Sequence, residues 1–348
     1  MSDVRLSASR YDDCCEVLAA FRNANCETHR DLAYFNWRYR VRPVEAEPII
    51  VWAETAQRER VGALSLVPHR SCLRGAMYPV GILGDISVAP EWRGKGVAQR
   101  MFRYLAGLPQ VAALEACVVL PYVEAAWPLG KCGWRKVTEI RRFVKFLDVE
   151  PRLSGRLPRS LRRPVATAIN FGMNTLSSEP LPREAMRFEA EMSDSIDDRF
   201  DDLWNRIDKG NFIGAVRDRA NLTWRYLRHP LRQYRIFTLV KQDQLCGYVV
   251  FHTSGQECSI DDLLCDENAC KPAHLLSFFG RHLRQNPGIP AITLRRNASD
   301  VCYPPLPRLG FIRRADTQDV MVMSGSESVA AALLDESRWL MTAGDKDV

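Results

Sequence analysis

The sequence predicts a mixed α/β protein in which one fold occurs twice. The main observation is an internal repeat in which five identical residues recur at fixed spacing. The two copies read Asp31-x5-Trp37-Arg38-Tyr39-x3-Pro43 and Asp218-x5-Trp224-Arg225-Tyr226-x3-Pro230. Each copy is followed by short apolar runs rich in β-branched and aromatic residues, which are typical of strands. The length of 348 residues agrees with about two domains of common size.

The hydrophobic pattern of the first copy predicts a mixed sheet with helices between its strands. Apolar residues that alternate with polar ones indicate strands, and apolar residues at helical spacing indicate helices. The expected elements are a strand at 4–7, helices at 12–23 and 30–40, strands at 48–54, 60–68 and 80–88, a helix at 97–106, a strand at 112–119, a short helix at 122–131 and closing strands at 134–147.

Composition and proline positions divide the chain into four parts. These are a first domain at 1–150, a basic connector at 151–185, a second domain at 186–325 and a C-terminal helix and tail at 326–348. The connector contains five prolines, and we expect it to carry one helix near 164–177. The second domain is expected to open with a strand at 186–192.

The connector region also holds most of the excess positive charge. Residues 151–187 contain seven arginines and two glutamates, which gives +5 of the net charge of +6. This stretch is either a solvated linker that packs on a domain or a basic patch for acidic lipid or an anionic substrate. In the second case a weak peripheral membrane contact would run through residues 152–163. Because the rest of the chain is nearly neutral, we expect no broad nucleic-acid surface.

Composition indicates a globular chain without metal or disulfide chemistry. With 46% hydrophobic and 26% charged residues, the chain has enough apolar surface for a core. No apolar run approaches the ~20 residues of a membrane helix. The N-terminus lacks the apolar region of a signal peptide, so we expect a soluble cytoplasmic protein. The eleven cysteines show no CxxC pair and the six histidines no ligand spacing, so no metal site is expected.

Residues 80–106 carry the clearest chemical signal. They read as an apolar strand, a turn that contains proline, a glycine-rich loop and an amphipathic helix. Gly94 and Gly96 allow the backbone to approach a ligand closely, while the N–H groups and dipole of the helix N-terminus favour a phosphate or diphosphate. Arg93 and Lys95 add positive charge there. The loop matches neither the Walker A pattern nor the dinucleotide fingerprint.

The run Arg93-Gly94-Lys95-Gly96-Val97-Ala98, after Val88-Ala89-Pro90, resembles V-x-P-x-x-R/Q-x-x-G-x-G/A, the acyl-CoA motif of the GCN5-related N-acetyltransferase (GNAT) superfamily. The resemblance covers about residues 1–148. It implies two tandem GNAT-like domains, the second degenerate, and acetyl-CoA or another acyl-CoA as co-substrate. The residues implied in cofactor binding are Ile86, Ser87, Val88, Arg93, Gly94, Lys95, Gly96, Val97 and Ala98. The alternative is a glycine-rich turn without a ligand.

The resemblance also suggests catalytic roles. Asp85, on the strand before the loop, stands where the family often keeps a carboxylate that acts as a base or holds water; otherwise it pairs with a nearby arginine. A backbone N–H near Val88 would polarise the thioester carbonyl. Many relatives have a tyrosine acid four residues before a Gly-aromatic pair, but Leu129 occupies that position here. Tyr122, seven residues earlier, is the remaining candidate for the acid.

The second copy lacks the glycine loop. After Ile260-Asp261-Asp262-Leu263-Leu264 the chain continues as Cys265-Asp266-Glu267-Asn268-Ala269-Cys270-Lys271-Pro272, where acidic residues would repel a diphosphate. We therefore expect the second domain to bind no CoA and to serve as a structural and acceptor-binding half. The two Trp-Arg-Tyr segments either form an acceptor site or fix the second helix of each copy, with the arginines paired to Asp31 and Asp218.

The resemblance therefore predicts an acyl-CoA-dependent N-acyltransferase that moves an acetyl or other acyl group to a small-molecule amine acceptor. The repeat resembles that of tandem GNAT proteins from bacterial polysaccharide gene clusters, which suggests an amino sugar or another cell-surface precursor as acceptor. Two alternatives remain open. One is a FemABX-like aminoacyl or peptidyl transferase, and the other is a non-catalytic regulatory protein that binds acyl-CoA.

Overall fold

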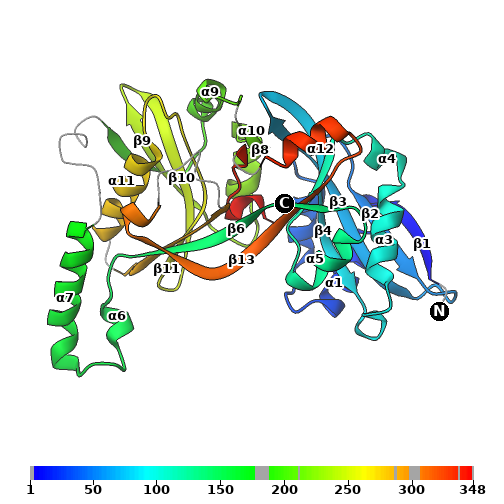
Figure 1. Ribbon diagram of the computed structural model, residues 1–348, viewed down its shortest axis with the longest axis horizontal. Helices are drawn as coiled ribbons and strands as arrows, with labels where there is room; N and C mark the ends of the chain where they lie inside the picture. The colour runs from blue at the N-terminus through cyan, green and yellow to red at the C-terminus, as the bar shows by residue number, and fades with distance from the viewer. Residues whose placement is uncertain are drawn as a thin grey trace.

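The computed structural model describes residues 4–176, 188–210, 212–285, 288–297, 306–335 and 338–346. In these residues one mixed sheet of 13 strands runs through two lobes, and helices cover it (Figure 1). The strand order is β1-β2-β3-β4-β5-β13-β6-β12-β11-β10-β9-β7, and β8 is attached to β3. The predicted mixed α/β class is confirmed.

The N-terminal lobe is built from the elements between β1 and β6. They are β1 (Arg5–Arg10), α1 (Cys15–Asn25), α2 (Leu32–Tyr39), β2 (Ile49–Glu54), β3 (Arg60–Leu73), β4 (Ala76–Val88), α3 (Val97–Ala106), α4 (Pro109–Ala112), β5 (Ala116–Val119), α5 (Val123–Gly130) and β6 (Arg135–Phe146). Alternate residues of β2 face opposite sides of the sheet. Val51 and Ala53 pack in the cluster of α3, whereas Ile50 and Trp52 pack in the cluster of α1 and α2.

The C-terminal lobe follows a helical connector. The elements are α6 (Glu150–Leu153), α7 (Arg159–Leu176), β7 (Glu189–Ser193), α9 (Asp198–Arg206), β8 (Ile213–Ala215), α10 (Arg219–Leu222), the short π-helical segment η3 (Thr223–Leu227), β9 (Arg235–Lys241), β10 (Gln244–Ser254), β11 (Glu257–Cys265), α11 (Pro272–Arg284), β12 (Ala291–Asn297), β13 (Phe311–Met323) and α12 (Glu327–Leu333). Part of the strand predicted at 186–192 falls at residues 186–187, which lie outside the described residues, and β7 follows them.

Several elements differ in length from the prediction. The strand expected at 112–119 is shorter, because the short helix α4 occupies its first residue and only Ala116–Val119 pairs. β3 and β4 are longer than expected, because a turn with positive φ at Arg74 and Gly75 joins them as one extended hairpin. The connector helix begins at Arg159 rather than near residue 164.

Two long strands join the lobes by exchange. β13, the last strand of the second half, lies between β5 and β6 of the first half, with Met321 opposite Val119. β6 in turn pairs with β12 of the second half, with Lys145 opposite Ile292. Figure 1 shows these two strands crossing from one lobe to the other. The closing strands predicted at 134–147 are therefore one long strand, whose neighbours both come from the other half of the sequence.

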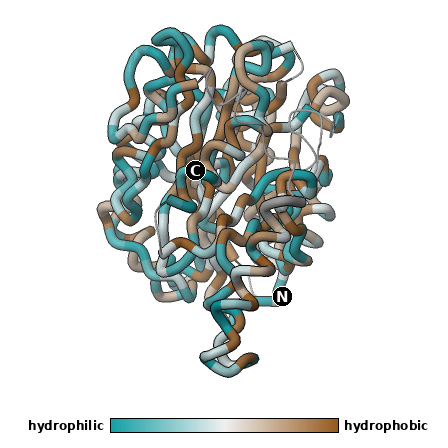
Figure 2. The backbone as a smooth tube through the Cα atoms, turned by 90° about the vertical axis from the view of Figure 1, so that its left-hand side faces the viewer, coloured by the Kyte–Doolittle hydropathy of each residue, from teal (hydrophilic) through white to brown (hydrophobic). Residues whose placement is uncertain are grey.

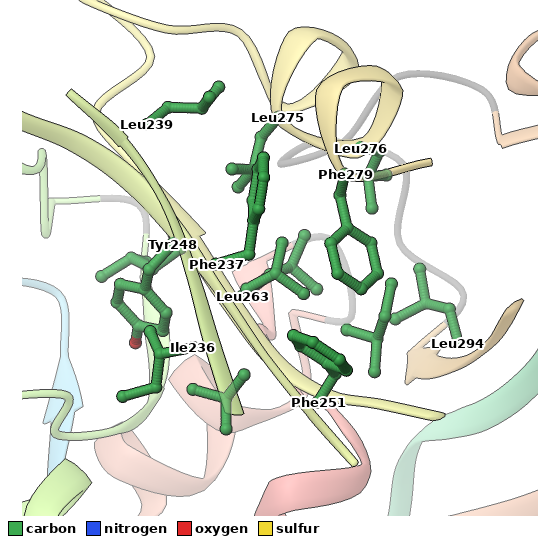
Figure 3. Packing of buried hydrophobic residues seen from close by; sticks show 14 of the residues in the cluster. Ile236, Phe237, Leu239, Tyr248, Phe251, Leu263, Leu275, Leu276, Phe279 and Leu294 are labelled. Atoms are coloured by element: carbon green, nitrogen blue, oxygen red, sulfur yellow. The ribbon is translucent and has the colours of Figure 1, made fainter. Parts of the chain in front are cut away.

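In the core of the C-terminal lobe, side chains of α11 pack against the sheet, with aromatic rings among aliphatic residues. Figure 3 shows Leu275, Leu276 and Phe279 of α11 facing the strands. The ring of Phe279 lies 4.9 Å from that of Phe251 and 5.5 Å from that of Phe237, centroid to centroid. Such rings remove large apolar areas from water, at roughly 25 cal/mol per Å².

Hydrophobic stretches of backbone lie in the middle of the molecule and hydrophilic stretches along its edges (Figure 2). In the part of the chain that the structure describes, no helix is both long and apolar enough to span a bilayer. The connector helix α7 extends away from the two lobes (Figure 1).

The two repeat segments meet where the lobes join. They form the end of α2 and the segment η3, and the rings of Trp37 and Trp224 stack with centroids 5.2 Å apart. This contact holds the C-terminal end of α2 against the C-terminal lobe, and Tyr34, earlier in α2, contacts His229 of the same lobe.

Candidate functional site

β4 and β5 separate at the end of the sheet where we expect the cofactor. The two strands pair in parallel only at Val80, Gly81 and Ile82 of β4, whereas β4 stays paired with β3 as far as Val88. From Leu83 onward, the edge of β4 that faces away from β3 has no strand partner in the described ranges. The backbone N–H and C=O groups of this edge are therefore available to a ligand, apart from the Val88 carbonyl, which accepts a hydrogen bond from Arg93.

A β-bulge lies on this part of β4. The pairing of β3 with β4 shifts between Ala63 and Ser65, and Asp85 has a φ of 45°, in the left-handed region. Gly84 leaves room for a neighbour, because a Cβ there would lie 2.1 Å from Nη2 of Arg38. The bulge and the glycine together allow the Arg38 guanidinium to reach the strand.

The glycine loop leads from β4 into α3. Gly94 and Gly96 have φ values of 74° and 78°, which residues with side chains rarely adopt. A Cβ at Gly94 would meet no atom of the described residues within 4 Å, and one at Gly96 would meet only Oε1 of Gln99, at 3.9 Å. The loop thus borders open space, and the first N–H groups of α3, beginning at Val97, lack acceptors within the helix. These donors suit a diphosphate.

The two basic residues of the loop differ in role. Arg93 donates from Nε to the carbonyl of Val88 at 3.0 Å and from Nη2 to the carbonyl of Asn25 at 2.9 Å. It therefore ties the loop to β4 and to the end of α1, and its charge stays beside the loop. Lys95 is exposed, with Nζ 5.1 Å from the ring centre of Trp92. Lys95 is thus not tied to a backbone carbonyl in the described residues as Arg93 is, which leaves its ammonium group the better placed to contact an anion.

The remaining residues predicted for cofactor binding lie along the same path. Ile86 and Val88 pack towards the cluster of α3, and Val97 and Ala98 of α3 join that cluster. Val97 is buried there, whereas Ile86, Val88 and Ala98 are half-buried, so these three keep part of their side-chain surface exposed. Ser87 is buried, and its Oγ has no hydrogen-bond partner among the described residues.

Asp85 lies in a buried ion cluster. Its Oδ1 is 3.5 Å from Nε of Arg22, its Oδ2 is 3.5 Å from Nε of Arg38, and the Tyr39 hydroxyl donates to Oδ2. Burial raises the pKa of this carboxyl, but the charge of Arg38, the Tyr39 hydrogen bond and Arg22 together bring the pKa below its ordinary value. The geometry agrees with the alternative in which Asp85 pairs with arginine, and it disfavours Asp85 as a base.

Both aspartates of the repeat cap helices. Asp31 accepts a hydrogen bond from the N–H of Tyr34 at 2.9 Å, and Asp218 accepts one from the N–H of Asn221 at 2.9 Å. Asp218 also pairs with Arg70 at 2.6 Å. The expected pairing of these aspartates with the repeat arginines is therefore wrong, because capping orients the carboxylates towards the helix start.

A wide polar cleft of about 980 Å³ lies between the lobes. Its lining comes from Arg30 and α2, from the loop after β5 and the start of α5, from the strands β6, β10, β11, β12 and β13, from η3 and the loop that follows it, and from Ala343 and Lys346. Tyr122, three residues after the end of β5, lines the cleft and is 70% exposed. Gln318 of β13 donates to the carbonyl of Leu120 at 3.0 Å and so fixes this end of β5. The cleft therefore begins at the strand that parts from β4. Leu129 is fully buried in α5 and lies outside the cleft lining.

Sequence reasoning missed a histidine–aspartate pair in this cleft. Nδ1 of His252 contacts Oδ2 of Asp261, and both residues line the cleft. When the carboxylate holds the proton on Nδ1, Nε2 is the basic nitrogen of the ring. The two residues come from neighbouring strands of a hairpin, β10 and β11, and their spacing gave no motif.

The C-terminal lobe keeps the strand geometry but not the loop. β11 pairs in parallel with β12 only from Glu257 to Ile260, so it also separates from its neighbour. Asp266 lies where the second lobe would need a glycine loop, and it accepts hydrogen bonds from the N–H of Asn268 at 3.1 Å and from Nε of Arg206 at 3.4 Å. A carboxylate therefore takes the place of a bound anion.

No group of three or more His, Cys, Asp or Glu side chains in the described parts of the chain could hold a metal ion.

The chain is similar to known proteins in two respects, namely the sequence of an N-terminal domain and the fold. Residues 5–111 match the family model of the acetyltransferase (GNAT) domain. No curated protein sequence is significantly similar to the chain.

The similar solved structures extend over both lobes. A GCN5-related N-acetyltransferase from Anabaena variabilis ATCC 29413 is 13% identical with a TM-score of 0.65, over 94% of this chain and 74% of that chain. A probable N-acyltransferase from Enterococcus faecalis V583 is 10% identical with a TM-score of 0.63, over 93% and 73%. The N-myristoyltransferase of Saccharomyces cerevisiae, with bound myristoyl-CoA, is 11% identical with a TM-score of 0.53, over 93% and 83%.

Proposed function

We propose, from the premise that the chain is an acyltransferase of the GNAT fold, that it transfers an acetyl or other acyl group from acyl-CoA to a small-molecule amine. The observation that carries this proposal is the continuous path from the unpaired edge of β4 to the glycine loop of α3. The edge begins at Leu83, and the loop contains Gly94 and Gly96. One end of the path offers donors for a diphosphate, and β5 at its other end leads into the cleft between the lobes.

The backbone of β4 would bind and orient the co-substrate. The N–H and C=O groups between Leu83 and Val88 would bond the pantetheine arm, and an N–H near Val88 would polarise the thioester carbonyl. The amine nitrogen then attacks that carbonyl carbon, so that a C–N bond forms and the C–S bond breaks. The nitrogen gives up one proton, and the departing thiolate takes one up.

The cleft supplies groups for both proton transfers. We assign the acceptance of the amine proton to Nε2 of His252, which Asp261 orients through Nδ1. Asp85 is the alternative base, and its buried ion pairs with Arg22 and Arg38 count against it. Tyr122 is proposed as the donor to the thiolate, since it lies in the loop after β5 and lines the cleft.

The acceptor would enter from the C-terminal lobe. The cleft combines polar groups with the aromatic rings of Tyr34, Trp37 and Tyr234. Such a lining suits a sugar ring, which presents hydroxyl groups and apolar C–H faces together. This chemistry supports an amino sugar or another cell-surface precursor as the acceptor.

The connector is proposed as a weak contact with anionic membranes. Residues 152–163 contain five arginines and no acidic residue, and α7 exposes Leu161 and Phe171. Basic and apolar side chains together favour the interface of an anionic bilayer. Vesicles with anionic lipid should bind the full chain, and neutral vesicles should not; equal binding to both would contradict this contact.

The activity is tested by thiol release. Purified full-length chain is incubated with acetyl-CoA and longer acyl-CoAs, each with a panel of amines that includes amino sugars, amino acids and polyamines. Release of CoA that depends on an amine, together with the acylated amine by mass spectrometry, is the expected result. Tight acyl-CoA binding without turnover on any amine would instead indicate the regulatory alternative.

A further inference from the structure

Positive charge collects in the cleft between the lobes. The carboxylates of the lining are all engaged: Glu257 with Arg142 at 3.2 Å, Asp316 with Arg295 at 3.7 Å, Asp319 with Lys136 at 2.6 Å, and Asp261 with His252. Four cations of the same lining make no ion pair within the described ranges, namely Arg30, Arg225, Arg232 and Lys346. The cleft therefore has more cations than its own acids neutralise.

A comparison of the two repeats explains why one of these cations, Arg225, has no carboxylate partner within the described ranges. In the first copy Arg38 pairs with Asp85, at the bulge of β4. The corresponding bulge of β11 falls at Asp261, where the β10–β11 register shifts. That carboxylate contacts His252, so it does not pair with Arg225, the counterpart of Arg38.

The next carboxylate of β11 is occupied as well. Nε of Arg217 lies 3.0 Å from Oδ1 of Asp262, and the hydroxyl of Tyr248 donates to Oδ2 at 3.1 Å. Arg217 therefore does in the second copy what the repeat arginine does in the first. This exchange of partners leaves Arg225 without an ion pair in the described ranges. Its side chain lines the cleft between the lobes and also a second, smaller cavity beside Trp224 and Tyr226.

One terminal nitrogen of the Arg225 guanidinium is hydrogen-bonded, and the other has no partner in the described part of the chain. Its Nη2 donates to the carbonyl of Lys346 at 2.5 Å, and its guanidinium carbon lies 5.9 Å from the ring centre of Trp37. Its Nη1 is buried and has no hydrogen-bond partner in the described part of the chain. A buried donor without a partner is unfavourable, and a bound acceptor atom would satisfy it.

Two further arginines converge on the same place from other elements. Arg30, before α2, lies with its guanidinium carbon 5.1 Å from the ring centre of Tyr34, and Arg232 donates to the Tyr234 hydroxyl at 3.3 Å. His229 lies among them: burial, followed by the charges of Arg225, Arg232 and Arg30, lowers its pKa to about 3. The neutral imidazole of His229 therefore lies among three guanidinium groups that make no ion pair within the described ranges.

We propose that the arginine cluster of Arg30, Arg225 and Arg232 binds a phosphoryl group of the acceptor, so that the acylated amine is a phosphorylated or nucleotide-linked molecule. The part of this inference that concerns the acceptor rests on the proposed function, whereas the anion site itself does not depend on acyl transfer. A phosphoryl group fits better than a carboxylate. Phosphate monoesters carry close to two negative charges, and diphosphates are multiply charged, whereas one carboxylate carries a single charge that one arginine can satisfy.

The test uses inorganic diphosphate as probe and equilibrium dialysis of the full chain at low ionic strength. Saturating CoA is present, so that the glycine loop of α3 is filled and cannot bind the probe. We expect one diphosphate to bind, with Arg232→Gln and Arg225→Gln each weakening binding at least tenfold. Arg295→Gln is the matched control, because it removes the same charge from the same cleft but from a guanidinium already paired with Asp316; it should change affinity less than twofold.

A second variant separates this site from the CoA site. Gly96→Glu, without CoA, should still bind one diphosphate if the arginine cluster is the site, even if the chain proves unable to transfer acyl groups. The inference is overturned if the CoA-saturated chain binds no diphosphate, if both arginine variants bind it as the wild type does, or if malonate binds more tightly than diphosphate. Circular dichroism of each variant verifies that the fold is retained, and Arg232→Gln serves alone if Arg225→Gln is unfolded.

Discussion

Trp37 and Trp224, the matching residues of the two repeats, bind each other's backbone. Nε1 of Trp37 donates to the carbonyl of Trp224 at 2.8 Å, and Nε1 of Trp224 donates to the carbonyl of Trp37 at 3.0 Å. Their rings are stacked with an interplanar angle of 20°. Each copy of the segment is thus the partner of the other, which gives a physical reason for both copies to carry the same residues.

Replacing Trp37 should therefore weaken both lobes at once. Trp37→Ala removes a buried ring and should lower the free energy of unfolding by about 3–5 kcal/mol. Trp37→Phe keeps an aromatic ring but leaves the Trp224 carbonyl unpaired, and should cost about 1–3 kcal/mol. Urea unfolding followed by tryptophan fluorescence and by circular dichroism measures both values.

The exposed Trp127, at 68% exposure, supplies the control. Trp127→Ala should change the free energy of unfolding by less than about 0.5 kcal/mol. If Trp37→Ala were as mild as Trp127→Ala, the reciprocal contact would have no part in joining the lobes.

Asp85→Asn should affect stability more than chemistry. The substitution leaves the guanidinium groups of Arg22 and Arg38 buried without their carboxylate and should cost about 3–5 kcal/mol. The folded pKa of Asp85 is below its unfolded value, so its contribution is present above about pH 4 and is lost as the pH falls through the folded pKa. In denaturant unfolding between pH 3 and 7, the free energy of unfolding should fall less at acid pH in the variant than in the wild type. A stable variant with a rate loss above a hundredfold would instead make Asp85 the base.

His252→Gln should lower kcat and leave acyl-CoA affinity unchanged. Glutamine fills similar space but cannot accept the amine proton, and loss of general base catalysis typically costs about 10²–10⁴-fold in rate. Amines of lower pKa should lose less, because they reach the site already neutral. Steady-state kinetics with acceptors of graded basicity gives the comparison, and a uniform loss across the series would speak against the role.

Tyr122→Phe should slow the reaction more with acyl-CoA than with an activated thioester whose leaving group needs no proton. Tyr122 is exposed, so the variant is expected to keep the stability of the wild type. Equal rate losses with both donors would remove Tyr122 as the acid.

His69 should make the fold sensitive to mild acid. Burial, with the charges of Arg42, Arg225 and Arg38, holds the pKa of His69 well below its ordinary value. The unfolded chain binds a proton at His69 below about pH 6.5 and the folded chain does not, so stability falls as the pH is lowered from 6.5. Between pH 6.5 and 5 this amounts to about 2 kcal/mol. Urea unfolding at pH 7.5 and 5.0 should show a smaller loss for His69→Asn than for the wild type, and equal losses would contradict the assignment.

Much of the fold follows from local sequence, and the strand exchange does not. Alternation and turn residues are local signals, so β2, β4 and α3 could be placed from their own residues. The partner of a strand is not a local property. Nothing in residues 134–147 shows that β13, more than 160 positions later, lies beside them.

The candidate site likewise has one part that could be predicted from the sequence and another that could not. The glycine loop is one contiguous motif whose positive φ values follow from Gly94 and Gly96, so it could be predicted. The position of Asp85 on its strand could be predicted from the sequence. Its partners Arg22 and Arg38 could not, because they lie on helices that only the folded chain packs against the sheet. The arginine cluster and the His252–Asp261 pair join residues from separate elements, and only the folded chain brings them together.

The most direct test of the account is calorimetric titration of acetyl-CoA into the full-length wild type, Gly96→Glu and Gly155→Glu. Gly155 also has a positive φ, of 84°, and open space around its Cβ position, but it lies in the connector, so it matches the strain and charge of the first variant. We predict one bound acetyl-CoA in the wild type and in Gly155→Glu, and none in Gly96→Glu. Wild-type affinity in Gly96→Glu, or no binding of acetyl-CoA or a longer acyl-CoA by the wild type, would contradict the central claim that the loop before α3 binds the diphosphate of coenzyme A.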